Sequence, residues 1–263
     1  MAGMKVLKVI TEAVTSSFRY PHIQIGRLPT YEVPPPATIY GHLAGVLGEW
    51  FEADGLEFAY IFEHRGKALD VETGHPIERG SGKFTLKNRN WDFPVNVECQ
   101  TNPQRREFLF RPRLTLFLKG SKELLDRFHG GFLNPAYSYI LGRSQDLATC
   151  IDAQWVDLND SDEAFFSHTI LPFEWRRWVL PGTSIQLPRS LNYYRRREPE
   201  FAVYLQVLWP ALKLYPGSQD TIGRENLPKT FTIDSKEQRE FAGRKLSRGL
   251  FFHPVIGPGS ASV

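Results

Sequence analysis

Cysteine is scarce in this sequence of 263 residues, which contains only Cys99 and Cys150. Neither cysteine lies in a Cys-x-x-Cys pair or beside a cluster of histidines, so the usual zinc-site spacings are excluded. Two isolated cysteines also provide no disulfide framework. This pattern fits a protein that works in the reducing cytoplasm.

Long apolar runs are missing as well. None approaches the roughly 18 consecutive apolar residues from which a membrane-spanning helix is recognised. The first ten residues alternate in polarity and carry Lys5 and Lys8, where a signal peptide would have an uninterrupted apolar segment. We therefore expect a cytoplasmic protein that makes no contact with a membrane.

Recognisable catalytic and metal-binding motifs are absent too. The seven histidines are scattered along the chain, and no two have the spacing of a metal-binding pair. No Ser/His/Asp or Cys/His arrangement occurs in a familiar context. We expect no metal ion, no cofactor and no catalytic residue.

The composition that is present is that of a soluble globular protein. Hydrophobic residues make up 41% of the chain and charged residues 23%, which is enough apolar material for a sizeable core. The net charge of +3 is too small to identify a nucleic-acid-binding protein by itself. Local basic clusters must therefore carry that argument.

Hydrophobic periodicity predicts two β-α-β units separated by an insertion. The predicted strands are residues 5–14, 56–62, 108–118 and 149–158, and the predicted helices are 37–50 and 122–128, the second closed by Gly130 and Gly131. This order is that of a ferredoxin-like or RRM-like α+β domain, a frequent platform for RNA. We place this domain at residues 1–160 and a smaller β-rich C-terminal subdomain at 161–263.

The insertion, at about residues 64–110, is predicted to be a projecting β-hairpin arm. Its basic residues recur between isolated aromatic residues, which suits single-stranded RNA because cations pair with phosphates and rings stack on bases. A solvated hairpin whose aromatic residues pack on the arm itself is the alternative. The residues concerned lie between positions 64 and 113 and are Lys67, Lys83, Lys87, Arg89, Arg105, Arg106, Arg111 and Arg113, with Phe84, Trp91 and Phe93.

A proline-rich loop leads into the first predicted helix. The triple proline at 34–36 cannot lie inside a helix but can start one. Free N–H groups at that helix start, together with the helix dipole, favour a phosphate. Thr38, Tyr40 and Gly41 are therefore candidate RNA contacts. Alternatively, the glycines of this helix only allow close packing on the sheet.

A Gly-Arg-Ser turn supplies a second group of candidates. Arg143 could make a bidentate contact to a phosphate, and the Ser144 hydroxyl could add a donor. Arg143 could instead tie its loop to a carboxylate such as Asp146. Arg19 and Arg27 flank the proline-rich loop and are candidates for the same groove, with solvated surface charge as the alternative.

Three segments, in the correct order, resemble one known family. The run Pro-Thr-Tyr-Glu-Val-Pro-Pro-Pro-Ala-Thr-Ile-Tyr-Gly at 29–41 is similar to the N-terminal signature of the fifth family of CRISPR-associated (Cas) proteins, and closest to its type I-B members. The run Leu-Gly-Arg-Ser-Gln-Asp at 141–146 resembles the family's Leu-Gly-Arg-Ser-Glu segment, and Phe-Arg-Tyr-Pro at 18–21 is a weaker match. Ala37 and Gln145 depart from the serine and glutamate that are common there.

This resemblance implies a RAMP fold, with an RRM-like core, a protruding thumb and a C-terminal region. It also implies a non-catalytic scaffold subunit that binds the 5′ handle of the guide RNA (crRNA) in a type I Cascade complex. Contacts with the backbone subunit and the large subunit follow, and target DNA is reached through the complex. His64 and Lys67, at the start of the arm, are candidate contacts to the RNA groove.

A metal-independent endoribonuclease is the principal alternative, because a type I-C branch of this family cuts precursor crRNA itself. Such cutting needs a general base and a general acid near the 2′-OH and the scissile phosphate. Tyr40, His42, His64 and Lys67 are the groups available for it, but the sequence shows no matched catalytic constellation. An unrelated ferredoxin-like module is the remaining alternative.

Overall fold

The computed structural model describes residues 4–23, 26–74, 77–85, 92–98, 102–177, 182–193, 198–208, 212–214, 228 and 230–258. Of the predicted arm residues, Lys87, Arg89 and Trp91 lie outside these ranges. For Lys83, Phe84 and Phe93 the structure describes the backbone alone.

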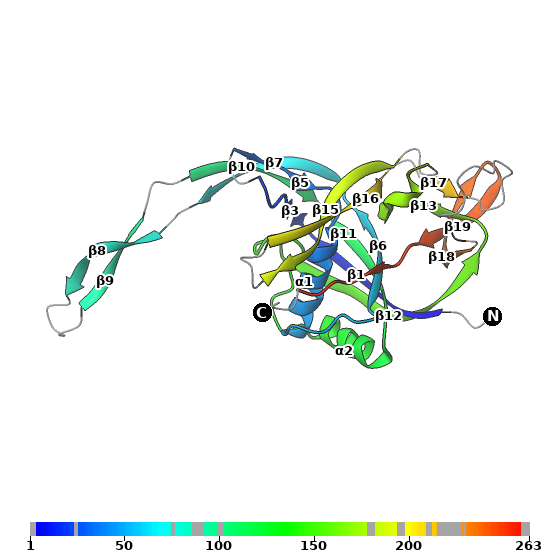
Figure 1. The fold of residues 1–263 in the computed structure, drawn as a ribbon, viewed down its shortest axis with the longest axis horizontal. Coiled ribbons are helices and arrows are strands. Elements are labelled where there is room, and N and C mark those ends of the chain that lie inside the picture. Colours follow the sequence, from blue (N-terminus) through cyan, green and yellow to red (C-terminus); the bar gives the residue numbers. More distant parts are fainter. Residues whose placement is uncertain are drawn as a thin grey trace.

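The centre of the molecule is the predicted β-α-β-β-α-β unit (Figure 1). Its elements are β1 (Met4–Ala13), α1 (Pro36–Leu47), β6 (Glu57–Glu63), β11 (Arg113–Lys119), α2 (Lys122–Leu133) and β12 (Ala148–Ser161). The four strands lie in the order β12-β1-β11-β6, and every neighbouring pair is antiparallel. This is the ferredoxin-like arrangement, so the predicted α+β fold class is confirmed.

Alternation along β1 distributes its side chains between two apolar layers. Leu7 and Val9 face the layer in which α1 contributes Ile39 and Leu43, whereas Val6 faces a second layer on the other side of the sheet. The helices therefore cover one face of the central sheet, since an amphipathic helix buries its apolar stripe there. None of the helices in the described ranges is long and apolar enough to cross a membrane.

The C-terminal residues extend the same sheet at both of its edges. At one edge β18 (Phe231–Phe241) continues from the end of β12, followed by β19 (Arg244–Leu250), β13 (Ala164–Phe166) and β17 (Leu212–Leu214). At the other edge β20 (His253–Pro254) pairs with β6. β12 runs through residue 160, and the division at that residue stays a prediction.

A second, smaller sheet packs against the helical side. It consists of β14 (Thr169–Pro172), β16 (Glu198–Val207) and β15 (Thr183–Asn192), with the short 3-10 helix η1 (Phe173–Arg177) after β14. Ile170 and Leu187 of this sheet are buried in the same apolar cluster as Ile39 and Leu43 of α1.

The inserted arm is a long two-part hairpin. Its base is the pair β7 (Gly66–Gly74) and β10 (Asn102–Phe110), and its outer part is the pair β8 (Ile77–Thr85) and β9 (Asp92–Glu98). Figure 1 shows β8 and β9 projecting far from the remaining strands. Four short strands brace the base: β2 (Thr15–Ser16) and β4 (Arg27–Leu28) pair with β10, while β3 (Phe18–Arg19) pairs with β5 (Thr30–Tyr31).

Three predicted elements are wrong in their boundaries. The helix predicted at 37–50 ends at Leu47, because Gly48 adopts a left-handed φ of 78° and closes it. The strand predicted at 108–118 is broken at Arg111 and Pro112, where Arg111 has a φ of 49°, and its halves belong to different sheets. The helix predicted at 122–128 continues through both glycines to Leu133. Glycine is needed inside it because a Cβ at Gly131 would lie 2.7 Å from Val46 Cγ1, so α1 and α2 could not pack as closely.

Candidate nucleic-acid interface

Four of the predicted RNA contacts converge on one hollow at the base of the arm. Arg19 comes from β3, Thr38 from the first turn of α1, and Arg143 and Ser144 from the loop after α2. The hollow has a volume of about 400 Å³, and we call it the Arg143 pocket. Its lining consists of Ser17, Phe18, Arg19, Thr38, Glu72, Arg106, Gly142, Arg143, Ser144 and Gln145.

Arg143 is held in this pocket by Asp146, as the alternative interpretation of the Gly-Arg-Ser turn proposes. Its Nε and Nη2 donate to the two carboxylate oxygens at 3.0 and 2.9 Å, and its backbone N–H donates at 2.9 Å. Thr15 Oγ1 and the Ser17 N–H complete the shell of Asp146 at 2.7 and 3.1 Å. Burial alone would raise the pKa of Asp146, but the hydrogen bonds from Arg143 and Thr15 outweigh it and hold that pKa below its ordinary value.

Gly142 explains why the turn has its sequence. Its φ of 125° is one that residues with side chains rarely adopt, and a Cβ there would lie 2.8 Å from the Ser17 nitrogen and 2.9 Å from Asp146 Oδ2. In the Leu-Gly-Arg-Ser-Gln-Asp segment, glycine therefore allows the backbone to lie close to Ser17 and Asp146, and Asp146 fixes the side chain of Arg143.

One donor of the guanidinium remains without a hydrogen bond. Arg143 Nη1 is buried and finds no hydrogen-bond acceptor among the described residues; its nearest carboxylate oxygen, Glu72 Oε1, is 3.6 Å away. Arg19 is exposed and has no ion-pair partner in the part of the chain that the structure describes. Both guanidinium groups could donate charge-assisted hydrogen bonds to an oxyanion bound in the pocket.

The formal charges in the pocket leave one positive charge in excess. Arg106 is paired with Glu72, and Arg143 with Asp146, so that among the described residues of the pocket Arg19 is the cation without an ion-pair partner. This balance suits a single phosphate. It does not suit a cluster of phosphates, which would need more free cations.

The start of α1 contributes less to anion binding than the sequence predicts. Pro35 and Pro36 carry no N–H, and the N–H groups of Thr38 and Ile39 both donate to the Pro35 carbonyl oxygen at 2.8 and 3.3 Å. At most the Ala37 N–H therefore remains for an anion. The prediction of several free N–H groups at this helix start is wrong, because two prolines and a tight first turn remove them.

Tyr40 and Gly41 do not line the Arg143 pocket. Tyr40 is buried, its hydroxyl donates to the Phe51 carbonyl oxygen at 2.9 Å, and its ring stacks on Phe51. A Cβ on Gly41 would meet nothing within 4 Å, so this glycine is not required for packing either. Both residues lie on α1 beyond its first turn, away from the pocket lining.

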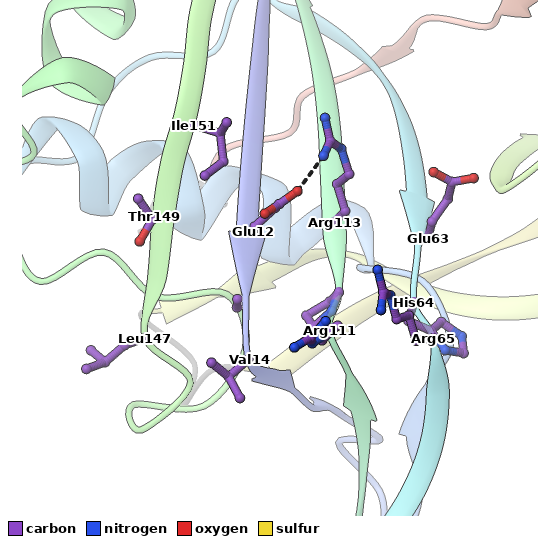
Figure 2. Close-up of a pocket in the computed structure, with 12 residues that line it drawn as sticks. Glu12, Val14, Glu63, His64, Arg65, Arg111, Arg113, Leu147, Thr149 and Ile151 are labelled. Atoms are coloured by element: carbon purple, nitrogen blue, oxygen red, sulfur yellow. Dashed lines mark hydrogen bonds and ion pairs between the residues drawn. The ribbon is translucent and has the colours of Figure 1, made fainter.

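His64 lies in a different hollow, at the end of the central sheet, which we call the His64 pocket. Its volume is about 600 Å³, and Arg65 and Arg111 line it together with the Glu12–Arg113 ion pair. Figure 2 shows His64 and Arg65 on one side of this hollow and the apolar side chains of Val14 and Leu147 on the other. The full lining is Glu12, Ala13, Val14, Glu63, His64, Arg65, Arg111, Pro112, Arg113, Leu147, Thr149 and Ile151.

Arg27 and Lys67 are engaged in ion pairs beside the arm. Arg27 donates twice to Glu107 Oε1, at 3.1 Å from Nε and 2.7 Å from Nη2. Lys67 Nζ donates to Glu32 Oε1 at 2.7 Å and lies 3.8 Å from Glu107 Oε2. These two cations therefore serve the attachment of the proline-rich loop to the arm, and neither lines the Arg143 pocket.

Sequence reasoning missed the contribution of Glu72 as a pocket residue and did not place Arg106 beside it. In the register of β7 against β10, Arg106 lies opposite Asp70 and pairs with Glu72, two residues further on. Strand register cannot be read from a polar alternating segment, because neither face has an apolar pattern that fixes it. Within the described ranges, no group of three or more histidine, cysteine or acidic residues is placed to hold a metal ion.

Comparison with known proteins identifies one family. A family model described as "CRISPR-associated protein (Cas_Cas5)" matches residues 6–211. No curated protein matches the chain.

Among solved structures, one described as "CRISPR RNA-guided surveillance complex" is 13% identical, with a TM-score of 0.48, and the match covers 84% of this chain and 96% of the other. A CRISPR protein from Archaeoglobus fulgidus is 10% identical, with a TM-score of 0.42, and the match covers 94% and 100%. A chain of the type III-B Cmr-beta complex bound to cognate target RNA is 11% identical, with a TM-score of 0.42 and coverage of 80% and 86%.

Proposed function

The chain belongs to the CRISPR-associated Cas5 family, and from this premise we propose that it is a non-catalytic subunit of a type I Cascade effector complex that binds and caps the 5′ handle of crRNA. The observation that carries this proposal is the Arg143 pocket. Arg143, whose buried Nη1 donates no hydrogen bond to any described residue, lines this pocket together with Arg19, which is exposed and has no ion-pair partner in the described ranges. This is an arrangement for one phosphate of a polyanion.

The pocket favours RNA binding because the guanidinium of Arg143 is held in position before RNA arrives. Asp146 holds Arg143 in place, and the side chain of Arg143 is only 12% exposed. Fixing a guanidinium in advance reduces the entropy lost on binding. Arg19 can then close on the phosphate from solvent, and the Ser144 hydroxyl adds a donor at the rim.

The positions of the candidate catalytic groups support a non-catalytic role. His42 is half-buried and engaged at both ring nitrogens: Nδ1 is 3.2 Å from the Ile140 carbonyl oxygen, Nε2 is 3.0 Å from the Tyr139 hydroxyl, and desolvation lowers its pKa to about 4. The Tyr40 hydroxyl is bonded inside the core, and Lys67 is held by Glu32. His64 lines a separate hollow. These groups do not share one place at which an acid and a base could act on the same phosphate.

The apolar half of the His64 pocket supports assembly with another subunit. Val14, Leu147 and Ile151 line this hollow while 69%, 63% and 52% exposed. Aliphatic groups gathered on a surface in this way mark protein contacts. We propose that the backbone subunit or the large subunit binds there. Target DNA is then reached through the assembled complex in the cytoplasm. The basic half of the pocket, with His64, is proposed to contact RNA.

The proposal is tested with the purified full-length chain and labelled guide RNAs that do or do not carry the repeat-derived 5′ handle. We expect tighter binding of the handle-bearing RNA, with binding that weakens as salt rises. The same chain, with or without magnesium, should leave the precursor repeat RNA intact. Equal affinity for both RNAs would contradict handle recognition. Site-specific cleavage that disappears in Tyr40→Phe or His42→Ala would contradict the non-catalytic role and identify the protein as an endoribonuclease.

A further inference from the structure

A second polar hollow lies where three distant segments of the chain meet. The segments are Tyr20 with residues 29–32 around β5, the base of the arm in β7 and β10, and the β15–β16 pair of the smaller sheet. The hollow has a volume of about 490 Å³, and we call it the Gln206 pocket. It is lined by Tyr20, Pro29, Thr30, Glu32, Lys67, Glu107, Thr183, Ser184, Ile185 and Gln206.

Gln206 carries the argument, because its amide nitrogen is buried and has no hydrogen-bond partner among the described residues. The residue is 7% exposed, and its Nε2 donates no hydrogen bond to any described residue. A buried donor left unsatisfied costs about 1–3 kcal/mol, and most such groups in folded proteins are paired. Because Gln206 lines the hollow, a ligand bound there could accept a hydrogen bond from its amide nitrogen.

The charges around this pocket balance and therefore disfavour a phosphate. Of the charged lining residues, Lys67 is paired with Glu32, and Glu107 is paired with Arg27, which lies outside the lining, so two cations meet two carboxylates. The exposed residues Thr183 and Ser184 add hydroxyl groups, which both donate and accept. A ligand that suits this lining is uncharged and carries donors and acceptors together, as the edge of a nucleobase does.

Tyr20 supplies a ring against which such a base can rest. Its ring is stacked on that of the buried Tyr31, with centroids 3.7 Å apart and planes inclined by 21°. Tyr31 thus fixes the orientation of Tyr20, whose side chain also lines the hollow. Recognition of single-stranded RNA commonly joins an aromatic ring with hydrogen bonds to the base edge.

Two consecutive residues of the chain line the two different pockets. Arg19 lines the Arg143 pocket and Tyr20 lines the Gln206 pocket, and neighbouring Cα atoms are about 3.8 Å apart. We propose that the Gln206 pocket receives one unstacked base of the same RNA whose phosphate occupies the Arg143 pocket, so that Gln206 reads a base edge while Arg19 and Arg143 hold the backbone. This inference rests on the proposed function and names the part of the RNA that the chain distinguishes.

An abasic scan of the handle tests the inference in the full-length protein. The probe is the repeat-derived handle RNA with an abasic residue placed at each position in turn. In the wild-type protein, one position should weaken binding about tenfold when its base is removed, as expected for loss of one stacked base. In Gln206→Leu the intact RNA should bind less tightly, and the abasic substitution at that position should cost little more. Leucine keeps most of the volume, and thermal unfolding verifies that the variant is folded.

Arg19→Ala is the matched control, because it weakens the neighbouring phosphate contact and leaves the base pocket intact. It should bind all RNAs less tightly and keep the full abasic penalty. If wild type binds the handle but no abasic position matters, or if the penalty survives unchanged in both Gln206→Leu and Tyr20→Leu, the base pocket is refuted while handle binding stands. If wild type does not prefer the handle RNA at all, the proposed function fails and the inference fails with it.

Discussion

Arg143 and Asp146 lie three residues apart in one loop and are joined by two side-chain hydrogen bonds of 3.0 and 2.9 Å, with the aspartate fully buried. The pair orders the loop after α2 and leaves Nη1 of the arginine directed away from the carboxylate. A structural role and a binding role are therefore combined in one side chain. Substitution of Arg143 alone cannot separate them, so the variants must be chosen to do so.

The first prediction concerns stability. Arg143→Ala should lower the free energy of unfolding by about 3 kcal/mol, because it leaves the Asp146 carboxylate buried without its main partner. Urea unfolding of the purified chain measures this. Arg127→Ala is the matched control, since it removes an arginine from the exposed pair with Glu49 and should cost less than about 1 kcal/mol. Equal losses of unfolding free energy in the two variants would show that the Arg143–Asp146 pair does not stabilise the fold.

The second prediction concerns RNA affinity without a change in stability. Arg19→Ala should weaken binding of the handle RNA about tenfold and reduce the slope of log affinity against log salt by about one, because one cation leaves one phosphate. Its unfolding curve should not change, since Arg19 is exposed and has no ion-pair partner in the described ranges. Arg244→Ala, which removes the same charge from β19, should leave affinity unchanged. An equal loss in both variants would indicate a general charge effect and no specific pocket.

Much of this site was visible in the sequence, and the reason is local. Arg143, Ser144 and Asp146 lie within four consecutive positions, so their spacing alone suggests the turn. Arg19 could be proposed because it flanks the proline-rich loop, and Thr38 because it lies at the start of the helix that follows this loop. Gln206 carried no signal, since its meaning depends on β16 lining one hollow together with Glu107 and Lys67 of the arm base, which lie 99 and 139 residues away in the sequence.

The fold shows the same division between local and long-range information. Short runs of β-branched and apolar residues, together with helical spacing, predicted the ferredoxin-like unit, because these patterns are local to each element. The break at Arg111 was missed since β-forming residues continue on both sides of it. The extension of α2 through Gly131 was missed because the closeness of Val46 on α1 decides it.

The third prediction concerns pH. Burial lowers the pKa of His253 to about 4, and its Nε2 lies 3.1 Å from the Ile170 carbonyl oxygen. The unfolded chain protonates this histidine near pH 6.5, whereas the folded chain resists protonation until about pH 4. Its contribution to stability is therefore complete above pH 6.5 and is lost as the pH falls toward 4.

His253→Gln isolates this effect, because glutamine keeps a donor for Ile170 but does not titrate. Between pH 7 and pH 5 the wild-type protein should lose about 1–2 kcal/mol more unfolding free energy than the variant. Urea unfolding at the two pH values provides the comparison, and the remaining titrating groups, His42 among them, cancel between the two proteins. Parallel losses would show that His253 is protonated equally easily in both states.

The last prediction concerns the outer part of the arm. Within the described ranges β8 and β9 pair only with each other, while Gly74 and Asn102 are opposite one another at the outer end of the β7–β10 pair. Two antiparallel strands whose ends are paired can be closed by a two-residue Asn-Gly turn. Replacing residues 75–101 with Asn-Gly should therefore leave thermal unfolding of the body unchanged.

Function should respond differently to the same replacement, because the outer arm carries Lys83, Lys87 and Arg89 and reaches beyond the body of the protein. The shortened chain should still bind isolated handle RNA through the Arg143 pocket, which retains Glu72 and Arg106. It should fail to assemble with the backbone subunit on a full-length guide RNA, as measured by co-purification and by nuclease protection of the first spacer nucleotides. If the shortened chain assembles and protects those nucleotides as the wild type does, the outer arm is not the thumb of the complex. Loss of handle binding together with assembly would instead place the RNA contact on the arm and not in the pocket.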